Sequence, residues 1–125
     1  MAEYKSIKGY DVQSYAADPV ATAAWTTSGA LNTGRQYSAG AGTTTAGLVA
    51  GGADDPLGYT DTTEEFNGTA WTEVTAYPAS RTYLGSAGSQ TAALYMGGGS
   101  PPTATSFHYD GTNWTAGGSM GTAIK

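Results

Sequence analysis

Three tryptophans divide this 125-residue chain into repeating units. Trp25, Trp71 and Trp114 are each followed by Thr, and successive Trp residues are 46 and 43 positions apart. Aligning the chain on these residues superimposes further identical positions without a gap, among them Arg35 on Arg81, Tyr37 on Tyr83, Gly42 on Gly88 and Leu48 on Leu94. A period of about 40–50 residues is typical of propeller blades, each a small antiparallel sheet. The spacing therefore predicts a β-repeat protein.

Within one unit, turn residues separate four short segments with strand character. In the second unit we predict strands over 81–84, 91–96 and 105–109 and a fourth opening at Trp114. The 91–96 segment is apolar throughout, which predicts burial on both faces, and the Gly run 97–99 ends it. Asp110-Gly111 is a hairpin signal. Because no segment has helical periodicity, the expected fold class is all-β.

The order of residues within each unit resembles the kelch repeat. An apolar strand ends in Gly-Gly, and an aromatic residue and then Trp follow, as in Leu48, Gly51-Gly52, Phe66 and Trp71. The resemblance covers residues 25–125 and implies β-propeller blades. The chain also resembles kelch-like structural and tail-associated proteins of marine bacteriophages, in the segments 1–9, 31–35 and 89–94. That resemblance implies a virion location.

The chain is expected to contain residues 1–20 as an N-terminal attachment or oligomerisation arm and residues 21–125 as the kelch-like repeat region. Two complete units and an extra Trp strand are too few for a closed propeller, which needs about four to eight blades. Open sheet edges favour association with other copies. We therefore predict closure by homo-oligomerisation, with a trimer of two blades per chain as the expected form.

Composition limits the partners and the chemistry. The net charge is −5, and no cluster of Lys or Arg occurs, so nucleic acid is not expected to bind. The absence of Cys excludes disulfides, thiolate zinc sites and the Cys-Tyr cofactor of the copper oxidases built on kelch blades. No signal-peptide run and no apolar stretch of about 20 residues is present, so we expect a soluble protein without membrane insertion.

No catalytic set stands out in the sequence. His108 is the only His and is expected to be a strand residue, not a metal ligand. The carboxylates at 54–55, 61 and 64–65 suit a solvated loop and strand edge better than calcium or paired-acid chemistry. The Gly-rich turns lack the Lys-Ser/Thr of a phosphate loop. Arg35 and Arg81 are expected to satisfy carbonyls or carboxylates between blades. We expect no enzyme activity, no cofactor and no metal.

Aromatic residues that do not repeat are the candidate binding residues. Tyr59 lies in a loop, 53–59, that is three residues longer in the first unit, next to Asp54 and Asp55, and Tyr77 also occurs in one unit only. An aromatic ring beside carboxylates suits sugar stacking and hydroxyl capture. The expected function is a non-enzymatic virion structural or appendage protein that presents a multivalent surface to a host-surface glycan or receptor. The alternative is a purely structural, self-assembling subunit, and other virion proteins are expected partners in both cases.

Overall fold

The computed structural model describes residues 24–56 and 58–125, and the predicted arm at 1–20 lies outside them. The described residues form ten β-strands and no helix, so the all-β prediction is confirmed. The first antiparallel sheet, the N-sheet, has the order β1 (Ala39–Gly42), β2 (Gly47–Ala50), β5 (Thr63–Phe66), β6 (Trp71–Val74). The second, the C-sheet, has the order β7 (Gly85–Ser89), β8 (Ala92–Met96), β9 (Ser106–Tyr109), β10 (Trp114–Ala116). Two four-stranded units are thus present, as predicted.

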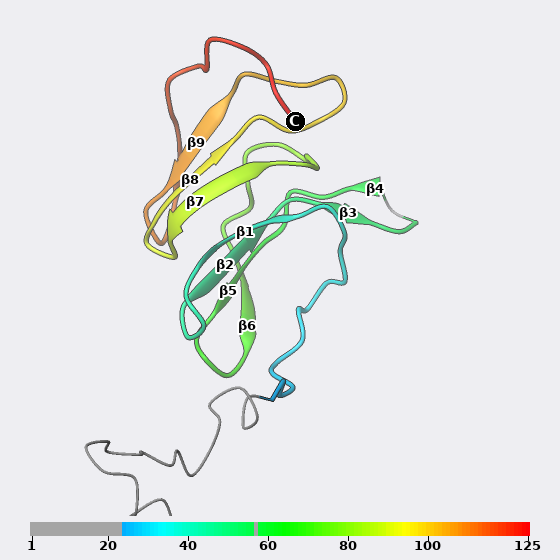
Figure 1. Cartoon of the computed structure of the whole chain (residues 1–125), viewed down its shortest axis with the longest axis vertical. Coiled ribbons are helices and arrows are strands. Elements are labelled where there is room, and N and C mark those ends of the chain that lie inside the picture. The colour runs from blue at the N-terminus through cyan, green and yellow to red at the C-terminus, as the bar shows by residue number, and fades with distance from the viewer. Residues whose placement is uncertain (1–23, 57) are drawn as a thin grey trace, which may run out of the picture.

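The two sheets pack face to face, and their first strands, β1 and β7, lie next to each other (Figure 1). We call the faces that meet the inner faces and the opposite ones the outer faces. Because side chains alternate along a strand, Leu48 and Ala50 lie on the inner face of the N-sheet and Val49 on its outer face. Tyr95 and Tyr109 enter the core from the inner face of the C-sheet. Aromatic rings supply much of a core that is poor in large aliphatic residues.

The first strand of the second unit does not lie where the sequence predicted it. The predicted segment 81–84 is an irregular connection, and the first strand of this sheet, β7, is formed instead by Gly85–Ser89. A tertiary contact, between β1 and β7, explains why the strand lies here. Small residues let β1 and β7 approach closely, and the Ser86 hydroxyl donates to the Gly40 carbonyl at 2.6 Å. Because β7 forms through close backbone approach to β1, its sequence lacks the alternation of apolar and polar residues that would predict a strand.

The other strands of the second unit follow the prediction. β8 and β9 lie within the predicted segments, and Asp110 begins the hairpin to β10. The Asp110 carboxylate accepts hydrogen bonds from the backbone N–H groups of Thr112 and Asn113. Those bonds lower the pKa of Asp110, because they favour its ionised form. The expected burial of the second strand on both faces is wrong, since Ala92 is exposed and the outer face of β8 remains partly open.

The repeat is visible in the hydrogen bonds as well as in the strands. The Trp71 indole N–H donates to the Gly29 carbonyl at 3.1 Å, and the Trp114 indole N–H donates to the equivalent Thr75 carbonyl at 3.0 Å. The Gly52 N–H donates to the Arg81 carbonyl at 2.7 Å, as the Gly98 N–H donates to the Ile124 carbonyl at 2.9 Å. The C-terminal residues therefore occupy, beside the C-sheet, the place that the start of the second unit occupies beside the N-sheet.

Close backbone approach explains the Gly-Gly pair that ends the second strand of each unit. Gly51 and Gly97 have φ values of 67° and 68°. A Cβ on Gly51 would lie 2.6 Å from the Arg81 carbonyl oxygen, and one on Gly97 would lie 2.7 Å from that of Ile124. Only Gly avoids both the strained backbone and the collision.

The extra Trp strand predicted at the start of the repeat region is not formed. Residues 24–30 belong to no strand, and Trp25 is fully exposed. In both sheets the fourth position is already filled, by β6 and by β10.

The three-residue insertion of the first unit forms a separate small hairpin of strands β3 (Ala53–Asp54) and β4 (Gly58–Tyr59). It projects from the side of the N-sheet (Figure 1).

Among the described residues, no helix is long and apolar enough to cross a membrane.

Candidate binding surfaces

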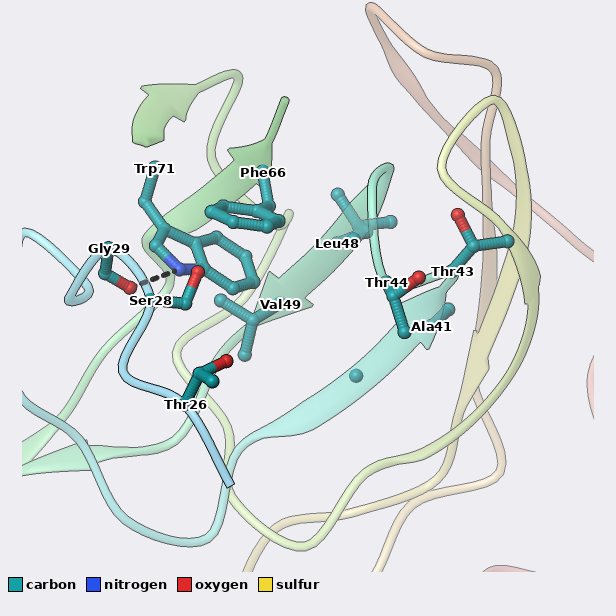
Figure 2. A pocket seen from close by; sticks show the side chains of 13 residues that line it. Thr26, Ser28, Gly29, Ala41, Thr43, Thr44, Leu48, Val49, Phe66 and Trp71 are labelled. Atoms are coloured by element: carbon teal, nitrogen blue, oxygen red, sulfur yellow. Dashed lines mark hydrogen bonds between the residues drawn. The ribbon is translucent and has the colours of Figure 1, made fainter. Parts of the chain in front are cut away.

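The outer face of the N-sheet carries a depression with a volume of about 790 Å³. Figure 2 shows the Trp71 and Phe66 rings next to each other beside Val49, with the segment 26–29 running past them. The two ring centroids are 5.0 Å apart, and the bond from Trp71 to Gly29 holds this segment in place. The depression has an apolar floor and a rim of Thr hydroxyls, which suits packing against another surface.

A second depression, of about 480 Å³, lies on the outer face of the C-sheet. Its lining includes Ala87, Leu94 and His108. As expected from the sequence, His108 is a strand residue on β9, and its side chain is exposed. Within residues 24–56 and 58–125, no group of three or more His, Asp or Glu side chains is placed to hold a metal ion.

Arg35 satisfies carbonyls and a carboxylate, as predicted, but within one unit. Its guanidinium donates to the Gly51 and Thr62 carbonyls at 3.2 and 2.7 Å and to the Glu64 carboxylate at 2.7 Å. Both side chains of the ion pair are fully buried. The backbone N–H of Asn32 also donates to Glu64, at 2.7 Å. This site is structural, because every polar atom around the guanidinium already has a partner.

The structure brings only part of the predicted binding site together. Asp54 and Asp55 line a shallow depression of about 340 Å³ with Arg35 and Gln36. Tyr59, on the paired strand of the same hairpin, is 53% exposed but does not line that depression. Strand alternation explains the separation, because Tyr59 pairs with Ala53, and Asp54, the next residue, points to the opposite side.

Tyr77 belongs to the core and not to a binding surface. It is 1% exposed, and its ring packs edge-on against Phe107 and Trp114 with centroids 5.3 and 4.9 Å away. Burial, opposed in part by the charge of Arg81, raises the pKa of Tyr77 to about 12. Tyr77, predicted as a binding residue, therefore lies inside the core, at the junction of the two sheets.

Two exposed aromatic residues were overlooked as candidates at the level of sequence. Tyr37 and Tyr83 occupy equivalent positions, and their rings stack with centroids 4.7 Å apart. Both lie at aligned positions of the repeat, whereas the predicted binding residues are aromatic residues that do not repeat. Exposure at equivalent positions is the signal that would have found them, and only the structure supplies it.

Comparison with protein-family models and with curated proteins finds no match to this chain.

Proposed function

We propose that this protein is a non-enzymatic structural subunit whose two four-stranded sheets are propeller-type blades, and that it assembles by stacking these sheets on the sheets of further copies. One observation carries the proposal: each outer face is the repeat equivalent of an inner face that is buried within the chain. Since the two inner faces fit each other within the chain, the two outer faces, which are their repeat equivalents, should fit each other between copies.

The equivalence holds at individual residues. On the outer face of the N-sheet, Val49, Phe66 and Trp71 occupy the positions of Tyr95, Tyr109 and Trp114, which the C-sheet buries against the N-sheet.

On the outer face of the C-sheet, Leu94 and His108 occupy the positions of Leu48 and Glu65, which face the C-sheet from the N-sheet. The outer face of the C-sheet can therefore receive the outer face of another copy's N-sheet. Such contacts are heterologous, and they form a ring when the rotation closes.

Two residue differences between the inner contact and the proposed contact between copies support this docking. Inside the chain, the Tyr109 hydroxyl donates to the Glu65 carboxylate at 2.8 Å. At the proposed contact between copies, Phe66 replaces the tyrosine and His108 replaces the glutamate. Both polar partners are lost together, so the contact buries neither an unpaired carboxylate nor an unpaired phenol.

The chain segments at the two ends set one condition for docking. Ile124 already accepts the Gly98 N–H, in the place where the start of a following unit would run. A second copy brings its own equivalent segment, around Arg35. The segment 26–29, bonded to Trp71, likewise occupies the place where the end of another copy's β10 would run. Stacking in register therefore requires these N-terminal segments of one copy, or the C-terminal residues of the other, to move aside.

The resemblance to kelch-like phage proteins supports placing the assembled subunit on a virion, in contact with other virion proteins. Three copies with two blades each would make a ring of six, within the usual range for propellers. Symmetric repetition would also give any weak surface site on one copy the avidity of several.

Two variants that block opposite faces test the assembly. Leu94→Lys places a charge on the outer face of the C-sheet, and Thr44→Lys places one on the rim of the N-sheet depression. Sedimentation velocity over a concentration series should show a rising mass for the native protein and monomers for each variant alone. A mixture of the two should form dimers and nothing larger, because each variant keeps one working face.

Thr69→Lys, in the exposed turn between β5 and β6, is the matched control and should assemble like the native protein. A native protein that stays monomeric at all concentrations, or variants that assemble normally, would refute the proposal.

A further inference from the structure

Three tyrosines from separate parts of the chain form an exposed group that neither the core nor the outer sheet faces use. Tyr37, Tyr59 and Tyr83 are 51%, 53% and 47% exposed. Tyr37 and Tyr83 stack with an interplanar angle of 38°. Desolvation and the neighbouring phenol groups of Tyr37 and Tyr59 raise the pKa of Tyr83.

The backbone holds this pair at an energetic cost. Tyr37 and Tyr83 both have φ of 57°, and among the described residues they are the only ones other than Gly with positive φ. A bulky residue in this conformation is strained, and such strain is often found at ligand sites. The Tyr83 N–H donates to the Tyr37 carbonyl at 3.0 Å and fixes the two together. Glycine would remove the strain, yet both repeats have tyrosine.

The insertion hairpin adds the third ring. Tyr59 lies on β4 opposite Ala53, and Ala53 in turn pairs with Gln36, the residue before Tyr37. The three residues that distinguish the first unit therefore build a hairpin that is tied to the base of the stacked pair. The second unit, without these residues, has no equivalent of Tyr59.

The chemistry around the group restricts the ligand. Arg35, two residues before Tyr37, is fully buried and neutralised by Glu64, so it offers no free positive charge to an anionic ligand. A wholly apolar ligand would cover phenol hydroxyls without giving them partners. A sugar ring presents C–H groups and hydroxyls together, which matches residues that each offer a ring face and a hydroxyl.

We propose that Tyr37, Tyr59 and Tyr83 form a binding platform for a neutral carbohydrate, with a hexose packed on the exposed ring faces and hydrogen-bonded to the phenol hydroxyls. The site lies within one chain. The proposal deepens the assembly proposed above, which would multiply the site, but binding by a single chain does not depend on assembly.

The test is an NMR titration of the ¹⁵N-labelled protein with maltohexaose and, separately, with cellohexaose. For at least one of them we expect saturable shifts confined to the neighbourhood of the three tyrosines, with a Kd of about 1 mM. Tyr59→Ala should weaken binding at least about tenfold, because it removes one ring from the platform. Trp25→Ala, which removes an exposed aromatic residue outside the group, should bind like the native protein.

Tyr83→Gly separates binding from folding. It removes a ring from the platform and relieves the backbone strain, so binding should be lost while the Tm stays the same or rises. The assembly-blocked variant Leu94→Lys should bind with the native Kd, which distinguishes failure of this site from failure of assembly. Absence of saturable shifts with both oligosaccharides, or native binding by Tyr83→Gly, would overturn the proposal.

Discussion

The two four-stranded sheets share their strand order, their Trp and their main-chain hydrogen bonds, but different side-chain interactions stabilise them. In the N-sheet, a buried ion pair joins Arg35 to Glu64. In the C-sheet, Phe107 stands at the position of Glu64, and it packs with Tyr77 in an aromatic cluster. Arg81, the equivalent of Arg35, forms no ion pair within the described residues, and its Nε is buried without a partner.

This difference shows which interactions define the repeat. The hydrogen bonds that recur accept at main-chain carbonyls, which every residue carries, so they survive changes of side chain. The ion pair needs two particular side chains, and it is absent once Phe107 takes the place of the carboxylate. One backbone framework therefore accommodates either a polar or an aromatic interior.

The largest contrast is expected at the two arginine positions. Glu64→Gln leaves the buried Arg35 charge uncompensated and should lower the free energy of unfolding by about 3–5 kcal/mol. Arg81→Met should change it by less than about 1 kcal/mol, because it removes a group whose buried Nε has no partner. Urea denaturation followed by circular dichroism measures both. Equal losses would mean that the two units rely on their arginines alike.

Trp71 and Trp114, on the last strand of each sheet, should also differ in their contribution to the free energy of unfolding. Trp114 packs against the rings of Tyr77, Tyr95 and Tyr109, so Trp114→Ala should cost about 3–4 kcal/mol. Trp71 contacts Phe66 on an outer face, and Trp71→Ala should cost about 1–2 kcal/mol in the monomer. Thermal unfolding at low protein concentration makes the comparison. At concentrations that permit assembly, the difference in stability loss between the two variants should become smaller, because stacking would bury Trp71.

Alkaline pH should reveal the aromatic cluster. The pKa of Tyr77 is raised to about 12 from the ordinary 10.0, so the fold favours its neutral form. Its contribution to stability is complete below pH 10 and is lost as the pH rises towards 12. Tyr77→Phe cannot ionise, so its free energy of unfolding should fall less over this interval. A native curve for Tyr77→Phe would argue against the cluster.

The smallest effect is expected at the insertion. Shortening the β3–β4 hairpin by three residues, to the length of the second unit, should change stability by less than about 1 kcal/mol, because surface loops tolerate changes of length. Heat denaturation measures this. A markedly destabilised variant would show that the hairpin supports the N-sheet and is more than a carrier of Tyr59.

Features that depend only on neighbouring residues could be predicted from the amino-acid sequence alone. The Trp spacing predicted two units, the Asp110-Gly111 turn predicted a hairpin, and the Gly-Gly pairs marked the ends of the second strands. Arg35 was expected to bond carbonyls or carboxylates between blades; it does bond carbonyls and a carboxylate, but within its own unit. Turn chemistry and hydrogen-bonding capacity are properties of short segments, so a single chain read alone reveals them.

The burial and exposure of individual residues depend on how the two sheets pack, and only the tertiary structure shows this packing. β7 is a strand because β1 lies beside it, and its small residues give no pattern from which that contact could be predicted. Tyr77 and Tyr59 look alike in the sequence, yet sheet packing buries the first, whereas the insertion hairpin exposes the second. Tyr37 and Tyr83 meet only because two units stack. Burial is a property of surfaces brought together from distant parts of the chain, and no local pattern encodes it.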